Sequence, residues 1–118
     1  MPNKVSKAAS KADVLPGTLD LMVLHTLESL GPQHGYGIAA RLEQVSHGVL
    51  QLNMGTLYPA LMRLEQRGLV RGSWGTTDSN RKARFYALTA TGRRQLLIEK
   101  RSWDQMAGII HTLLHGES

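Results

Sequence analysis

The sequence predicts a mainly helical fold that carries one small β-hairpin and ends in a long C-terminal helix. Apolar residues recur at helical spacing in four segments, whereas between residues 69 and 88 they alternate as they do in strands. Glycine or proline stands at most of the boundaries between these segments. The 118 residues suffice for a single hydrophobic core, so the length excludes a large two-domain enzyme.

The composition is that of a folded protein with an excess of basic residues. Apolar residues make up 42% and charged residues 19%, and the net charge is +5. The longest uninterrupted apolar run, Leu21–Leu24, is far shorter than the ~18 residues of a membrane span, and no apolar stretch of signal-peptide length follows the N-terminal lysines. There is no cysteine for a disulfide or a thiolate metal site. We therefore expect a soluble, cytoplasmic protein that does not span a membrane. Its partner should be polyanionic, but composition alone does not separate nucleic acid from an acidic membrane surface.

The first segment with helical spacing follows a basic arm. Residues 1–13 are rich in lysine, alanine and serine without periodicity, which indicates a flexible arm. A helix is predicted from Thr18, as N-cap, to Leu30, before a Gly-Pro pair at 31–32. Its apolar residues cover more than half of the circumference, so we expect this helix to contact two neighbours, one of them a second subunit.

Two shorter helices are predicted next. Glycine begins the first of them, which spans residues 35–45. Asn53 is the expected N-cap of the second, which runs to Arg67 and ends before Gly68 in a left-handed conformation. Pro59 falls about six residues into this helix and is expected to loosen its first turn, because a proline removes one backbone hydrogen bond.

A hairpin and a long helix complete the chain. Strands are predicted at 69–75 and 83–88, joined by a polar and basic connection. Thr89 is the expected N-cap of the last helix, which runs to about His115. Such a helix is too long for so small a body to cover, so we predict a homodimer through its apolar heptad positions. These interface residues are Leu96, Trp103, Met106, Ile110 and Leu113.

The order helix, helix, helix, hairpin, helix is that of a winged helix-turn-helix with a C-terminal dimerisation helix. The expected organisation is a basic arm (1–13), a winged helix-turn-helix domain (14–89) and a dimerisation helix (90–118). Residues 54–84 carry six basic and two acidic residues, hence +4 of the net +5. The basic charge therefore coincides with the third helix and the hairpin, the two elements that contact double-stranded DNA in this fold.

Polar residues on the outer face of the third helix and at the hairpin are the candidate DNA contacts. Asparagine and threonine near a helix N-terminus can reach base edges, whereas arginine and lysine neutralise phosphates. An alternative for Arg63 and Arg67 is an ordinary solvated face paired with Glu65 or with the helix dipole. The candidates from these two elements are Asn53, Thr56, Tyr58, Arg63, Arg67, Asn80, Arg81, Lys82 and Arg84.

Several separated motifs resemble the PadR family of bacterial transcriptional regulators. They read LPGTLD (15–20), GPQHGYGI (31–38), GTLYPAL (55–61), RKARFY (81–86) and LTATGR (88–93). The resemblance covers about residues 15–106 and implies a dimeric winged-helix protein, usually a repressor, of the compact subfamily with a single tail helix. It also implies that Tyr36 and residues 55–59 lie near the DNA, although partial core packing is an alternative for Tyr58.

The resemblance further implies an effector site at the tail helix. In compact members a tail tryptophan, paired across the dimer axis, holds flat aromatic compounds, and Trp103 matches it. Met106 and Ile110 on the tail and Leu19 and Met22 on the first helix are the expected lining, with a planar hydrophobic ligand. The alternative is that Trp103 is ordinary interface core.

Metal and enzyme functions are not predicted. His111 and His115 lie one helical turn apart, with Glu117 nearby, but they lack a third fixed ligand. No nucleophile has an adjacent base, and no cofactor motif is present, because the Gly-x-Gly at 35–37 lacks the preceding strand that a dinucleotide site needs.

Three functions remain: a repressor released by a small molecule, a DNA-binding regulator whose dimer interface is only structural, and a protein-interaction adaptor. The basic hairpin favours the first two, which would recognise a near-palindromic operator with half-sites about one helical turn apart. MarR-type regulators share the Leu-Thr-x-x-Gly junction at 88–92, but they usually carry extra helices before the first one, for which this chain has no room.

Overall fold

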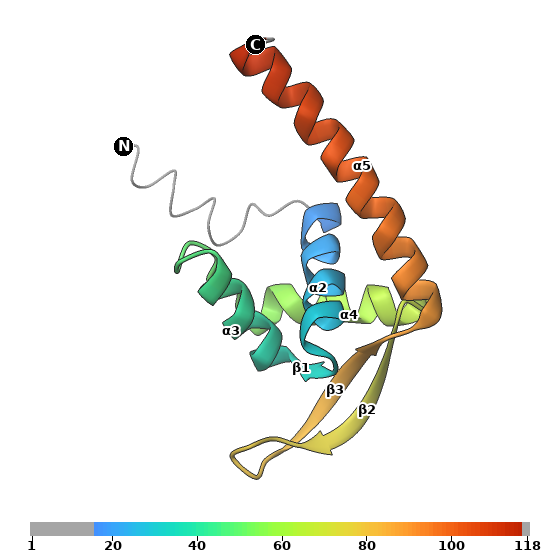
Figure 1. Ribbon diagram of the computed structural model, residues 1–118. Helices are drawn as coiled ribbons and strands as arrows, with labels where there is room; N and C mark the ends of the chain where they lie inside the picture. The colour runs from blue at the N-terminus through green and yellow to red at the C-terminus, as the bar shows by residue number, and fades with distance from the viewer. Residues whose placement is uncertain (1–15, 117–118) are drawn as a thin grey trace.

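Helix α2 (Pro16–Leu30) lies at the centre of the computed structural model, which describes residues 16–116 (Figure 1). The predicted arm at 1–13 and Glu117 lie outside the described residues. The remaining elements follow in the predicted order, with one addition. They are β1 (Gln33–His34), α3 (Gly35–Val45), α4 (Met54–Gln66), β2 (Val70–Thr76), β3 (Lys82–Leu88) and α5 (Ala90–His115).

Side-chain caps fix the starts of three helices. Asn53 Oδ1 accepts a hydrogen bond from the backbone N–H of Thr56 at 2.9 Å, and Thr89 Oγ1 accepts one from that of Gly92 at 2.9 Å, which confirms both predicted N-caps. His34 caps α3 by accepting from the Gly37 N–H at 3.0 Å, a role that the sequence analysis did not assign. Each cap satisfies a donor that the first helical turn would otherwise leave without a partner.

Two predictions about prolines are wrong. Helix α2 begins at Pro16 and not after an N-cap at Thr18, because proline fits the first helical position, where no N–H is needed. Helix α4 begins at Met54 despite Pro59, since the Asn53 cap and the 3.1 Å bond from Leu57 N–H to the Asn53 carbonyl hold its first turn together.

The sheet has three antiparallel strands in the order β1-β3-β2. β2 and β3 form the predicted hairpin, called the wing below, with Thr76 opposite Lys82 next to the turn. β1 was not predicted: its two residues are extended because they pair with Phe85 and Tyr86 of β3. The wing is therefore fastened near its middle to the segment that leads into α3. A strand thus does precede the Gly-x-Gly at 35–37, but it is antiparallel and only two residues long, unlike the parallel strand of a dinucleotide-binding fold.

The hydrophobic core is built around α2, which contacts α3, α4, β3 and α5. Its Val23, Leu24 and Leu27 are fully buried and pack with residues from each of these layers. Their partners include Ile38, Leu57, Leu61, Leu64, Tyr86 and Leu96. Burial of these side chains removes apolar surface from water and fixes the relative positions of α4, the wing and α5.

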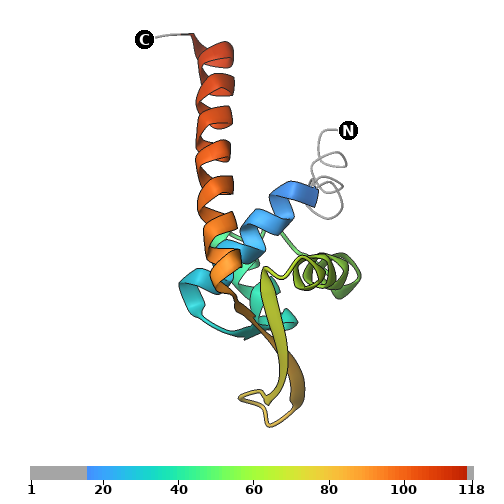
Figure 2. The same cartoon turned by 90° about the vertical axis from the view of Figure 1, so that its right-hand side faces the viewer.

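The second half of α5 extends beyond this body, in the direction opposite to the wing (Figure 2). Leu96, at 1% exposure, is the heptad residue that the core buries, whereas Trp103 is 51% and Leu113 78% exposed. Met106, Ile109, Ile110 and Leu114 are also exposed. No helix among residues 16–116 combines the length and apolar character that crossing a membrane requires.

Gly92→Ala should destabilise the fold, because the added Cβ would fall on the carbonyl oxygen of Leu69 and 2.9 Å from Leu88 Cδ1. We expect a loss of about 1–3 kcal/mol in the free energy of unfolding, as for other overpacked sites. Gly108→Ala in the same helix is the matched control, since nothing lies within 4 Å of its Cβ, and it should stabilise the helix by up to ~1 kcal/mol. Urea unfolding at one protein concentration measures both; equal midpoints would contradict the close packing at Gly92.

Candidate nucleic-acid interface

The N-terminal half of α4 presents polar groups on the side opposite its buried residues, and Pro59 is exposed as well. Leu57, Ala60 and Leu61 are fully buried, which leaves Thr56 and Tyr58 on the partly exposed side. Asn53 is exposed, and its side-chain oxygen is already used as the cap, so its NH₂ group is the part that faces solvent as a donor. The unpaired N–H groups of the first turn and the helix dipole favour an anion here.

A hollow of about 800 Å³ lies between the wing and the starts of α3 and α4. Five of the predicted DNA contacts line it: Tyr36, Tyr58, Arg81, Lys82 and Arg84. Seven other lining residues were not predicted: His34, Gly35, Trp74, Thr77, Ser79, Ala83 and Tyr86. A large aromatic residue between small residues, Ser73 and Gly75, was the signal for Trp74, which is 66% exposed. We call this hollow the wing groove.

The wing turn is held by local hydrogen bonds and leaves two cations exposed beside it. Thr77 N–H donates to the Arg81 carbonyl at 2.8 Å, and Arg81 N–H donates to Thr77 Oγ1 at 3.1 Å. Asn80 has a φ of +64°, a conformation that asparagine tolerates better than most residues. Arg81 and Lys82 are exposed, and Lys82 Nζ lies 5.9 Å from the centroid of the Trp74 ring.

Two predicted contacts at the C-terminal end of α4, one within the helix and one at its C-cap, are paired with a carboxylate. Arg63 Nη2 donates to Asp20 Oδ1 at 3.2 Å, and Arg67 Nη1 lies 4.0 Å from Asp20 Oδ2. Asp20 is 8% exposed, and its burial raises the pKa of its carboxyl group above the ordinary value, against the opposing effect of the two arginines. These ion pairs of Asp20 join α2 to the C-terminal end of α4.

A third predicted contact, Arg84, is also paired. Its Nη2 donates to Glu65 Oε2 at 2.7 Å, a distance typical of a strong charge-assisted hydrogen bond. This bond is the main cause that raises the pKa of Arg84 above its ordinary value. Of the ten predicted contact residues, three arginines thus have a carboxylate partner, while Arg81 and Lys82 have no ion pair within residues 16–116.

A second hollow, of about 450 Å³, lies between α2, α3 and α5, away from the wing groove. Its wall is mostly apolar and includes Met22 and Trp103 of the predicted effector set. Leu19 is 3% exposed within the core, and Met106 lines a neighbouring shallow hollow at the start of α2. Ile110 lies one turn further along α5 and is exposed. We call the hollow between α2, α3 and α5 the tail pocket.

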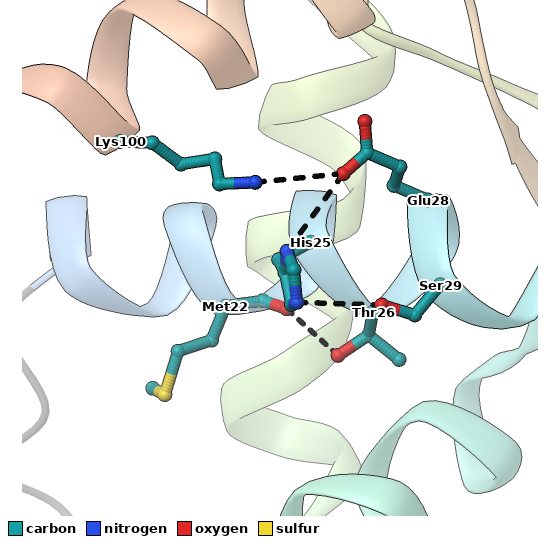
Figure 3. Close-up of polar contacts among 6 residues, drawn as sticks. All are labelled: Met22, His25, Thr26, Glu28, Ser29 and Lys100. Atoms are coloured by element: carbon teal, nitrogen blue, oxygen red, sulfur yellow. Dashed lines mark hydrogen bonds and ion pairs between the residues drawn. The ribbon is translucent and has the colours of Figure 1, made fainter.

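Polar groups at the junction of α2 and α5 border the tail pocket (Figure 3). His25 Nδ1 and Lys100 Nζ each lie 3.8 Å from Glu28 Oε1, and His25 Nε2 is 3.3 Å from the Ser29 hydroxyl. Thr26 donates its hydroxyl hydrogen to the Met22 carbonyl at 2.8 Å. Lys100 thus has a carboxylate partner, and because the wall of the pocket is mostly apolar, apolar contact dominates what it can offer a ligand.

The rings of the two tail histidines lie close together at a tilt of 46°. The ring centroids of His111 and His115 are 4.7 Å apart, and both side chains are exposed. No group of three or more potential metal-ligating side chains occurs within residues 16–116. The pair alone therefore offers two of the four ligands that a structural zinc site uses.

Comparisons with known proteins agree with this architecture. The family model described as "Transcriptional regulator PadR-like family" matches residues 23–97. A transcriptional regulator of Mycobacterium tuberculosis is 33% identical over 84 residues, which cover 71% of this chain and 77% of that protein.

Solved structures are similar over most of the chain. A PadR-like transcriptional regulator from Bacillus cereus is 27% identical with a TM-score of 0.76, over 90% of this chain and 100% of that one. A PadR family regulator from Eggerthella lenta is 31% identical with a TM-score of 0.70, over 86% of this chain and 85% of that one.

Family membership also identifies the class of function. The winged helix-turn-helix, the basic wing beside α4 and the long tail helix are the parts of a DNA-binding regulator, and the family consists of transcriptional regulators, not enzymes. The chain belongs to the PadR-like family of DNA-binding transcriptional regulators.

Proposed function

We propose that the protein is a homodimeric, cytoplasmic repressor that binds a near-palindromic operator and is released by a planar hydrophobic small molecule. The observation that carries the proposal is the placement of unpaired cations and exposed aromatic rings at one end of the body and of an uncovered apolar helix at the other. DNA binding and subunit pairing can therefore use separate surfaces of the same chain.

At the DNA end, α4 would enter the major groove with its N-terminus, while the wing groove would receive the adjoining phosphate backbone. Asn53 and Thr56 would face bases, and Arg81, Lys82 and Asn80 would face phosphates or the minor groove. Tyr36 and Tyr58 line the wing groove and can donate their hydroxyl hydrogens to phosphate oxygens. Arg63, Arg67 and Arg84 would contact DNA only in competition with their carboxylate partners.

At the other end, the exposed half of α5 would pair with a second copy. Six of its large apolar side chains are about half exposed or more, and a monomer would leave them in contact with water. Residues 14–89 would then act as the DNA-binding domain and residues 90–118 as the dimerisation helix. A twofold pairing would present two α4 helices to successive major grooves, which matches a near-palindromic operator.

The tail pocket is the proposed binding site of the small molecule that releases the protein from its operator. Its volume of about 450 Å³ suits a small molecule, and Trp103 and Met22 supply flat or polarisable apolar contact. Because its wall comes from α2, α3 and α5, a ligand there can favour one orientation of the tail helices over another. Release from the operator requires that, in the orientation that the ligand favours, the spacing of the two α4 helices does not match successive major grooves.

The first prediction concerns the wing cations. Arg81→Ala and Lys82→Ala should each weaken binding to DNA of any sequence and lower the slope of log affinity against log salt by about 0.9, the value for one lost phosphate contact. Arg101→Ala removes an exposed cation from α5 and is the control. Fluorescence anisotropy over a salt series, with an operator selected from random DNA, measures these slopes. Unchanged slopes for both wing variants would favour the protein-interaction adaptor.

The second prediction concerns the oligomeric state. Sedimentation equilibrium should give twice the chain mass of 13.0 kDa, and Leu113→Glu should shift the equilibrium to the monomer because it would bury a charge in the interface. Val49→Glu replaces an exposed valine between α3 and α4 and should leave the mass unchanged. A native protein that stays monomeric at all concentrations would remove the proposed dimer.

The third prediction concerns the effector. With Trp74→Phe in the background, the remaining fluorescence reports Trp103, and titration with planar aromatic compounds should quench it and release the operator. Trp103→Ala should lose most of the affinity, measured by calorimetry, because the ring supplies the flat contact surface. Absence of affinity in both proteins would leave the dimer interface purely structural.

A further inference from the structure

We propose that Glu65 and Arg84 form a latch that fixes the wing relative to α4, and that Glu65 is a positioning residue for DNA binding. The proposal rests on the role assigned above to the wing cations. Glu65 is absent from the predicted DNA contacts, and its negative charge lies in the most basic segment of the chain. An acidic residue at such a place weakens DNA binding by simple electrostatics, so its presence there calls for a structural reason.

Glu65 reaches both strands of the wing with one oxygen atom. Oε2 accepts the 2.7 Å hydrogen bond from Arg84 of β3 and a second one, at 3.3 Å, from the backbone N–H of Gly72 in β2. These contacts join the last part of α4 to the base of the wing. The wing is therefore tied to α4 by directional polar bonds in addition to the apolar core.

The missing side chain of Gly72 makes room for the latch. A Cβ at this position would lie 2.5 Å from Arg84 Nε and 2.7 Å from its Nη2, closer than such atoms can approach. Because Arg84 pairs with Trp74, its guanidinium must cross β2 next to Gly72 to reach Glu65. The glycine thus serves as the passage for the guanidinium of Arg84.

Tyr86 supports the same guanidinium from β3. Arg84 Cζ lies 5.9 Å from the centroid of the Tyr86 ring, within the range of a cation–π contact. Tyr86 is 4% exposed, and burial raises the pKa of its hydroxyl above the ordinary value, so it stays neutral beside Glu65. Arg84 is consequently held by a carboxylate, a ring and a glycine passage, which restricts its orientation.

The latch positions the wing cations because a small tilt of the hairpin at Gly72 produces a larger displacement at its tip. From Gly72 to Thr76, opposite Lys82, the strand extends about 13 Å at ~3.3 Å per residue. A tilt of ~10° at the base would move the wing tip by about 2 Å, which is enough to break a phosphate hydrogen bond. The latch therefore controls whether α4 and the wing tip can contact the DNA at the same time.

Substitution of Glu65 distinguishes the latch from simple electrostatics by the sign of the effect. Glu65→Gln removes one negative charge, and by charge alone it should strengthen DNA binding, as the control Asp78→Asn in the wing turn should do. A latch predicts the opposite for Glu65→Gln: roughly tenfold weaker binding, since the charge-assisted bond to Arg84 is lost. Anisotropy with the selected operator compares both variants with the native protein, and thermal unfolding verifies that each is folded.

The decisive measurement combines Glu65→Gln with removal of the wing cations. In the native background, Arg81→Ala together with Lys82→Ala should weaken binding roughly tenfold or more. In the Glu65→Gln background the same two substitutions should weaken DNA binding only about twofold, because a misplaced wing has already lost these contacts. If Glu65→Gln only lowered the stability of the fold, the two wing substitutions would weaken DNA binding by the same factor in both backgrounds.

Each outcome decides one of the two proposals. If the pair of wing substitutions has no effect in the native background, the proposed role of the wing fails. If it has its full effect in both backgrounds, or if Glu65→Gln binds DNA as tightly as Asp78→Asn, the latch is overturned. Should Glu65→Gln fail to fold, the charge-swapped variant Glu65→Arg with Arg84→Glu keeps the net charge, and restored binding relative to Arg84→Glu alone supports the latch, whereas no restoration overturns it.

Discussion

The burial of α2 is the constraint on which the other parts of the structure depend. Val23, Leu24 and Leu27 are fully buried, and they contact residues of α3, α4, β3 and α5, so all of these elements are packed against one helix. Close packing of this kind transmits displacement instead of absorbing it. The core therefore fixes the angle between α4 and the protruding half of α5. In a dimer, each subunit can then move as one rigid unit.

Local signals in the sequence predicted much of this fold because they act within a few residues. The caps at Asn53 and Thr89 are confirmed, and Gly68 has the predicted left-handed conformation with a φ of +73°. β1 was missed because two residues become a strand only through pairing with β3, more than 50 positions later in the chain. The cap at His34 was missed because histidine is not among the residues preferred at an N-cap.

The charge count predicted where basic residues cluster but not which of them have a carboxylate partner. Asp20 and Arg63 are 43 positions apart, and Glu65 and Arg84 are 19 apart, so neither pairing follows from helical or strand spacing. Periodicity places a side chain on a face, whereas the partner across that face depends on tertiary packing. This is why the arginines of α4 and β3 resembled the wing-tip cations in the sequence, although they differ from them in the structure.

Two carboxylates on different elements hold α4 in place, and their environments differ in a way that matters for regulation. Asp20 is buried, and burial disfavours its charge, so the α2–α4 contact contributes less than its Arg63 distance of 3.2 Å suggests. Glu65 is about one third exposed and keeps more of its hydration while it binds both wing strands. Under the proposed mechanism, a ligand in the tail pocket acts on α2, α3 and α5 and leaves the contact between Glu65 and the wing untouched. Release would then change the distance between two intact DNA-binding bodies, and each of them would keep its non-specific affinity for DNA while the dimer loses the operator.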